Sequence, residues 1–172
     1  MGSRLVILLL LFANSSFSQG LFEYSDTLNK KRRNWVWITE GVGASSSIFL
    51  LNEVWYKNYP RSPIHSFNDN AEWLQMDKVG HAMTSYYVGL VGNEMMKWSG
   101  VESKHAALFG STLGLVYLTG VELLDGTSAE WGFSWGDMIA NGSGALLAGG
   151  QELLWQEQRI KMKVSSHQTT YA

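Results

Sequence analysis

The stretch DKVGHAMTSYY, residues 77–87, places an acid, a base and a histidine at the start of an otherwise apolar segment. Asp77 and His81 are four positions apart, and Ser85 follows after four more, so a helix would carry all three side chains on one face. The stretch therefore predicts a helix whose first turns are polar and whose remainder is buried or faces an apolar medium.

Uncharged apolar runs separated by polar loops predict four helices in the chain. We expect them at about residues 35–56, 72–98 or 77–98, 102–125 and 134–163, with both prolines in the loop after the first. No segment alternates with a period of two, so we expect no sheet. Helices of this length joined by short loops favour an all-α fold, a four-helix up-down bundle. Many glycines fall inside the expected helices, which indicates close packing of helix backbones.

The first 18 residues are typical of a signal peptide. Arg4 precedes the apolar run 5–13, and the small residues Ser16 and Ser18 precede an expected cleavage before Gln19. The run is too short to span a bilayer, which leaves a buried N-terminal helix as the alternative. We therefore divide the chain into a signal peptide (1–18), a polar and basic lead (19–34), a helical bundle (35–163) and a disordered tail (164–172).

Composition narrows the class of protein. The chain has no cysteine, so an exported form would lack disulfides, thiol nucleophiles and a lipidated N-terminal cysteine. A net charge of −2 gives no reason to expect a nucleic-acid partner. All eight tryptophans lie near expected helix ends, as in interfacial aromatic belts, so we expect membrane lipid as a partner. The short uncharged helix interiors favour the alternative, a soluble periplasmic bundle.

Three polar groups interrupt the apolar helices at helical spacing. They are Asp77, Lys78 and His81 near the start of the second helix, Glu122 and Asp125 at the end of the third, and Asp137 and Asn141 at the start of the fourth. In an up-down bundle these three positions lie at the same end, so the groups are expected to converge. Helix capping alone would account for Asp77, and for Asp137 with Ser134 before it, but not for the acids that end the third helix.

The residue types in this cluster predict two kinds of chemistry. As a metal site, the ligands would be His81, Glu122, Asp125, Asp137 and Asn141, which suit Mg, Mn, Ca or Zn. As a metal-free catalytic site, Asp77 would orient His81 as a general base, and Lys78 or Asn141 would hold an anionic group. Ser85 lies within helical reach of His81, but no serine-hydrolase motif surrounds it. A purely structural polar network remains the third interpretation.

The motif set resembles a known family. DKxxH at 77–81, ExxD at 122–125 and GFSWxDxxANxxG at 132–144 look like the YfiM-like predicted periplasmic lipoproteins, a domain-of-unknown-function family, over residues 77–150. A looser similarity links the chain to VanZ-like membrane proteins. Neither family implies an established reaction. The chain departs from the lipoprotein pattern because it lacks the lipidated cysteine and has an additional first helix.

These observations favour an exported, membrane-associated protein of the cell envelope with a polar site at one end of a helical bundle. The enzyme alternative is metal-assisted or acid-base chemistry on an envelope lipid or wall precursor. The other alternative is a soluble periplasmic structural or binding bundle. Whether the protein is an enzyme stays open at the level of sequence.

Overall fold

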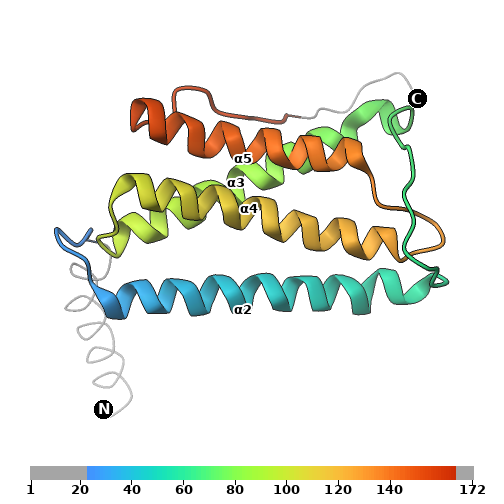
Figure 1. The fold of residues 1–172 in the computed structure, drawn as a ribbon, viewed down its shortest axis with the longest axis horizontal. Helices are drawn as coiled ribbons and strands as arrows, with labels where there is room; N and C mark the ends of the chain where they lie inside the picture. The colour runs from blue at the N-terminus through green and yellow to red at the C-terminus, as the bar shows by residue number, and fades with distance from the viewer. Residues whose placement is uncertain (1–22, 166–172) are drawn as a thin grey trace, which may run out of the picture.

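The fold is an antiparallel bundle of four long helices. The computed structural model describes residues 23–165, which form α2 (Lys30–Val54), α3 (Met76–Trp98), α4 (Ser103–Gly126) and α5 (Trp135–Trp155) (Figure 1). Two short 3₁₀ helices, η1 (Tyr56–Asn58) and η2 (Trp73–Gln75), lie in the loop between α2 and α3. The described residues contain no strand, only two isolated bridges that join this loop to the loop before α5. The prediction of an all-α up-down bundle is confirmed, whereas the expected signal peptide lies outside the described residues.

Local caps explain where two of the helices begin. The Asn29 side chain accepts a hydrogen bond from the Arg32 amide at 3.1 Å, so α2 starts at Lys30 and not at Trp35 as expected. The basic residues assigned to a polar lead are therefore the first turn of α2. Ser134 caps α5 in the same way, accepting from the Asp137 amide at 3.1 Å, as the sequence predicted.

The last helix is shorter than predicted. It ends at Trp155 because Gln156 adopts a left-handed backbone conformation with φ of 57°. The following segment is irregular and turns back along α3 and α5, where the buried Gln151 side chain bonds both the amide and the carbonyl of Ile160. The expectation of one helix to Lys163 is wrong. Polar side chains of the bundle form hydrogen bonds with the backbone of this segment, in place of the bonds that it would make within a helix.

Small residues hold α3, α4 and α5 close together. A methyl group added at Gly110 would lie 2.1 Å from the Gly89 carbonyl oxygen, and one at Gly144 would lie 2.0 Å from the Ala82 oxygen. These positions require glycine, which confirms the expected close backbone packing. In contrast, α2 has a single buried residue, Val36, and much of its length stands away from the other three helices.

Large apolar side chains are abundant on the outside of the bundle. One described helix, α4, is long and apolar enough to cross a membrane by length and composition, and only 28% of its most apolar window is buried. Phe49 on α2, Val91 on α3 and Leu146 on α5 are also more than half exposed. The buried interfaces are rich in glycine, alanine and serine, with a few large residues such as Tyr86, Met96 and Leu118, while many large apolar side chains lie outside.

Candidate functional site

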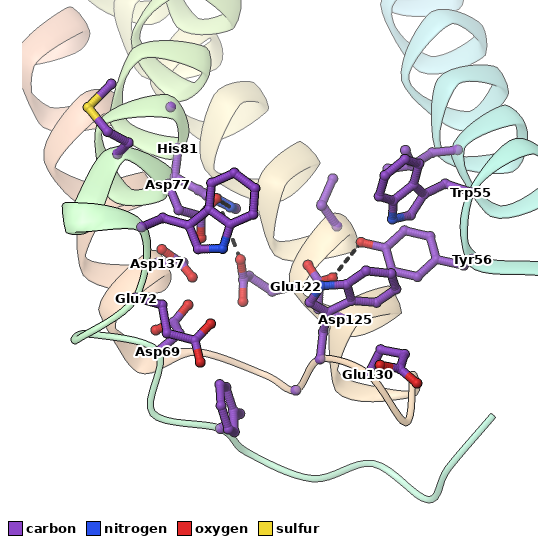
Figure 2. A pocket seen from close by; sticks show the side chains of 18 residues that line it. Trp55, Tyr56, Asp69, Glu72, Asp77, His81, Glu122, Asp125, Glu130 and Asp137 are labelled. Atoms are coloured by element: carbon purple, nitrogen blue, oxygen red, sulfur yellow. Dashed lines mark hydrogen bonds and ion pairs between the residues drawn. The ribbon is translucent and has the colours of Figure 1, made fainter. Parts of the chain in front are cut away.

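The polar groups of α3, α4 and α5 meet at one end of the bundle, as the sequence predicted. They line a cavity of about 640 Å³, which we call the polar pocket (Figure 2). Its carboxyl groups come from three helices and the two loops beside them: Asp69, Glu72, Asp77, Glu122, Asp125, Glu130 and Asp137. His81 is the basic side chain among the lining residues, which include no lysine or arginine in the described part of the chain. The pocket is thus strongly acidic.

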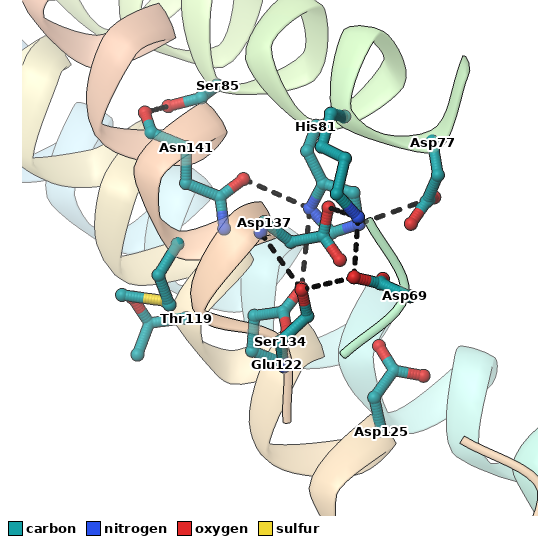
Figure 3. Close-up of polar contacts among 12 residues, drawn as sticks. Asp69, Asp77, His81, Ser85, Thr119, Glu122, Asp125, Ser134, Asp137 and Asn141 are labelled. Atoms are coloured by element: carbon teal, nitrogen blue, oxygen red, sulfur yellow. Dashed lines mark hydrogen bonds and ion pairs between the residues drawn. The ribbon is translucent and has the colours of Figure 1, made fainter. Parts of the chain in front are cut away.

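His81 lies between three of the predicted partners (Figure 3). Its Nδ1 is 3.0 Å from Asn141 Oδ1 and 3.5 Å from Glu122 Oε1. Its Nε2 faces Asp77, with 3.7 Å between Nε2 and Oδ1. If Nδ1 carries the proton and donates it to the Asn141 oxygen, Nε2 presents its lone pair to the pocket. Asn141 therefore acts as an orienting residue for the imidazole ring.

Lys78 makes ion pairs and is not free to bind an anion. Its Nζ is 2.6 Å from Asp69 Oδ1 and 3.1 Å from Asp137 Oδ1. Burial would lower the pKa of Lys78, but its interactions with the Asp69 and Asp137 carboxylates raise that pKa overall, so the ammonium stays charged. The predicted catalytic role of Lys78 thus has less support in the geometry than a role in positioning Asp137.

Asp69 is a site residue that the sequence analysis missed. Its Oδ1 accepts hydrogen bonds from the Ser134 hydroxyl at 2.7 Å and from Lys78. The available signal was the polar run Asn68, Asp69 and Asn70 in a loop expected at the same end. Helical periodicity says nothing about where a loop residue points, and backbone bonds such as that from the Phe67 amide to the Phe133 carbonyl hold this one in place.

Glu122 is the most deeply buried acid of the pocket. Its side chain is 1% exposed, and its Oε2 accepts a hydrogen bond from the Ser134 amide at 3.1 Å. Its Oε1 has no hydrogen-bond donor among the described residues. Burial raises the pKa of Glu122 to about 8, assisted by the neighbouring charges of Asp137 and Asp125. An unpartnered carboxylate oxygen at this depth favours a bound proton or a bound cation.

Asp125 lies on the other side of the pocket and has its own partner. The Tyr56 hydroxyl donates to Asp125 Oδ1 at 2.6 Å, and burial raises the pKa of Asp125 to about 6. Asp137 also has a raised pKa, chiefly because it is buried. Among the described residues, one group offers three ligand atoms within 4.8 Å of one another, and it consists of Asp77, His81 and Asp137. The geometry thus brings Asp77 into the metal set and leaves Asp125 outside it.

An aromatic wall faces the acidic side of the pocket. Trp55 and Tyr56 lie opposite His81 and Asp77 in Figure 2. The ring of Trp131 packs 6.0 Å from Trp55 and 5.6 Å from Tyr56, measured between ring centroids. The pocket therefore has an aromatic wall, which also holds Asp125 through Tyr56, opposite His81 and Asp77.

The remaining candidates lie outside this pocket. Ser85 is fully buried and donates to the Asn141 carbonyl at 2.7 Å, so it joins α3 to α5. His65 is at the same end but is exposed, with Nδ1 near Ser62 Oγ and Pro63 O. His105 is exposed at the opposite end beside Glu102.

Comparison with known proteins gives one match. Residues 66–150, just under half of the 172 residues, match the model of a family described as predicted periplasmic lipoprotein (DUF2279). The matched range contains every polar residue that α3, α4, α5 and the Asp69 loop bring to the pocket. The match supports an exported protein of the cell envelope and the resemblance to a periplasmic lipoprotein family, while the YfiM-like and VanZ-like similarities stay predictions. No curated protein and no solved structure matches the chain significantly.

Proposed function

We propose that this is a cell-envelope protein whose polar pocket binds a divalent cation through Asp77, His81 and Asp137. The observation that carries the proposal is the approach of one ligand atom from each of these residues to within 4.8 Å of the others. The 3.7 Å between His81 Nε2 and Asp77 Oδ1 is long for a hydrogen bond. It suits two ligands of one ion, since each would lie about 2 Å from the metal.

The charge balance of the pocket supports a cation. Seven carboxyl groups line it, and Lys78 offsets two of them from the side. Without a cation, the raised pKa of Glu122, about 8, favours its protonated form at neutral pH. A bound divalent ion would replace that proton by direct attraction, because opposite charge favours the ionised carboxylate.

The contacts around His81 support the same assignment. A metal-binding histidine normally donates its second ring N–H to an acceptor, which sets the tautomer and the ring direction. Asn141 Oδ1 occupies that position at 3.0 Å. Asn141 and Glu122, both predicted as ligands, would then support the ligands instead. One imidazole and two carboxylates suit Zn²⁺ or Mn²⁺ better than Mg²⁺ or Ca²⁺, which prefer all-oxygen sites.

Calorimetric titration of the purified, metal-stripped chain with Zn²⁺ and Mn²⁺ tests the site. We expect one ion per chain, loss of binding in His81→Ala and Asp137→Asn, and a 10- to 100-fold weaker affinity in Asn141→Ala. His105→Ala is the matched control, because that histidine also neighbours a glutamate but lies at the opposite end. Wild-type protein that binds neither metal, or variants that bind as tightly as wild type, would contradict the proposal.

We propose in addition that the protein associates with a lipid membrane. The support is the set of exposed large apolar side chains on all four helices, including Phe49, Val91, Val116 and Leu146, around an interior of small residues. Helices in lipid associate through such small residues, since apolar side chains gain nothing by leaving the lipid. We expect the protein to stay in the membrane pellet after a carbonate wash. Its full release into the supernatant would favour the soluble alternative.

A second candidate function is metal-assisted or acid-base catalysis on an envelope lipid or wall precursor. It is favoured by His81, whose Nε2 faces the pocket beside Asp77 while Asn141 holds Nδ1. The test is incubation of the metal-loaded protein with extracted envelope lipids and wall precursors, followed by mass spectrometry. A mass change that depends on His81 would support an enzyme, whereas an unchanged profile would favour a binding protein.

A further inference from the structure

A second cavity, of about 270 Å³, lies between α2, α3 and α4. In each of these helices, a residue that lines the polar pocket is followed, one turn farther from the site, by a residue that lines the second cavity. These one-turn pairs are Leu51 and Ser47 on α2, Gly80 and Thr84 on α3, and Val121 and Tyr117 on α4. The two cavities are therefore neighbours along the bundle, and we call them together the trough.

The trough lies along α2, which packs only sparsely against α3 and α4. Gly43 lines the second cavity, and a methyl group placed on it would meet nothing within 4 Å. Ile48 contacts α4 near Gly120, and the Ser47 hydroxyl is 3.2 Å from the Tyr117 hydroxyl. These contacts join α2 to α4.

The lining of the trough changes in character along its length. The polar pocket presents carboxylates, which accept hydrogen bonds and donate none when ionised. The second cavity presents Val88, Leu113 and Ala44, and its serine and tyrosine hydroxyls contact each other. Glu40 is its one ionisable carboxyl, and burial raises the pKa of that group, which favours its neutral form. From Glu40 to Ser47 on α2, the second cavity extends about 10 Å at 1.5 Å per residue.

We propose that the trough binds a single-chain amphiphile, with its hydrocarbon chain between α2, α3 and α4 and a hydroxyl-rich head in the polar pocket. The proposal names the ligand class of the proposed cation site and rests on that site for the head of the ligand. A hydroxyl-rich head matches a pocket of acceptors, because hydroxyls donate to carboxylates and also coordinate hard cations. The rings of Trp55 and Trp131 offer an apolar face to a sugar ring.

Alkyl glucosides of increasing chain length, each below its micelle concentration, test the proposal by calorimetry with the metal-loaded full chain. From hexyl to decyl glucoside, we expect the affinity to rise about fourfold per methylene, which corresponds to about 0.8 kcal/mol for each buried group. Glucose alone should bind much more weakly. An affinity that does not change with chain length would overturn the proposal.

Two glycine variants distinguish binding of the amphiphile in the trough from nonspecific binding elsewhere on the surface. Gly43→Leu fills the trough, and leucine favours a helix more than glycine does, so the fold should persist. We expect this variant to lose the dependence on chain length and to bind metal like wild type. Gly41→Leu is the matched control, because Gly41 is equally open in α2 but does not line the cavity. Equal effects of the two substitutions would overturn the proposal.

Metal titration without amphiphile keeps the two proposals apart. Metal binding, together with an amphiphile affinity that does not depend on alkyl chain length, would support the cation site and reject amphiphile binding in the trough. Chain-length dependence that Gly43→Leu abolishes, in protein that binds no metal, would support the trough and reject the cation site. Decyltrimethylammonium that binds more tightly than decyl glucoside would overturn the assignment of a hydroxyl-rich head.

Discussion

The two ends of the bundle each bury a glutamate, and they treat it in opposite ways. Glu152, at the end opposite the pocket, is 3.1 Å from the Gln158 amide and 2.6 Å from Lys97 Nζ. Burial alone would raise the pKa of Glu152, but the bonds from Lys97 and Gln158 hold it below its usual value. Glu122, at the pocket end, has one backbone donor and a pKa raised to about 8. One end pairs its buried carboxylate with an ammonium of the same chain, and the other leaves Glu122 Oε1 without a hydrogen-bond donor among the described residues.

The partners of a buried acid indicate whether it stabilises the fold or binds a ligand. A buried carboxylate whose partners come from the same chain contributes to folding, whereas one that lacks a partner lowers stability unless a ligand supplies it. The following variants test whether the two ends of the bundle differ in this way.

The largest effect is expected from Lys97→Ala. It would leave Glu152 buried at 3% side-chain exposure without its ammonium partner. We expect the free energy of unfolding to fall by about 3 kcal/mol at pH 7, as for other buried pairs that lose one member. Urea denaturation measures the change. A loss below about 1 kcal/mol would mean that Gln158 and water stabilise the buried Glu152 carboxylate without Lys97.

In protein kept free of metal, we expect the stability of the fold to decrease with rising pH because of Glu122. Its carboxyl has an ordinary pKa of 4.5 but keeps its proton to about pH 8 in the folded state. Between these values the folded state binds more protons than the unfolded state, so stability falls as the pH rises. We expect a loss approaching 1.4 kcal/mol per pH unit between pH 6 and pH 7.5, measured by denaturation at each pH.

Glu122→Gln provides the control for that slope. The amide cannot ionise but keeps an oxygen to accept from the Ser134 amide. We expect the slope to disappear and the variant to exceed wild type in stability at pH 8. The same slope in both proteins would assign it to another group. Asp125 contributes mainly below pH 6, where its own pKa lies.

Ser134→Ala tests how far the pocket depends on a single hydroxyl. The Ser134 hydroxyl accepts from the Asp137 amide and donates to Asp69, so its loss should cost about 1–2 kcal/mol. The matched variant at the other end is Ser99→Ala, whose buried hydroxyl makes one bond, to the Met96 carbonyl at 2.7 Å. We expect Ser99→Ala to cost less in thermal denaturation, and a reversed order would contradict the comparison.

The smallest effect is expected from His105→Ala. This histidine is 72% exposed and lies 3.2 Å from the equally exposed Glu102. Solvent-exposed pairs contribute little, so we expect a change below about 0.5 kcal/mol in the free energy of unfolding. A larger change would show that exposed charges at this end matter more than the paired Glu152 suggests.

Much of the fold and part of the site followed from sequence pattern. The convergence of His81, Glu122 and Asp137 was predictable because helical spacing and up-down topology involve only local rules and chain direction. The contribution of Asp69 was not, because its position depends on a loop held by contacts with the segment before α5. The pairing of Lys78 was also hidden, since Asp69 lies in an irregular loop and Asp137 lies on another helix.

The residues 77–87 by themselves determined a helix with Asp77 and His81 on one face, because the 3.6-residue period places i and i+4 together. Sequence also determined that the acids of the third and fourth helices would meet them. Tertiary structure alone decided which nitrogen of His81 faces the pocket, since Asn141 comes from another helix. It alone opened the trough beside Gly43, because the separation of two helices depends on side chains of both.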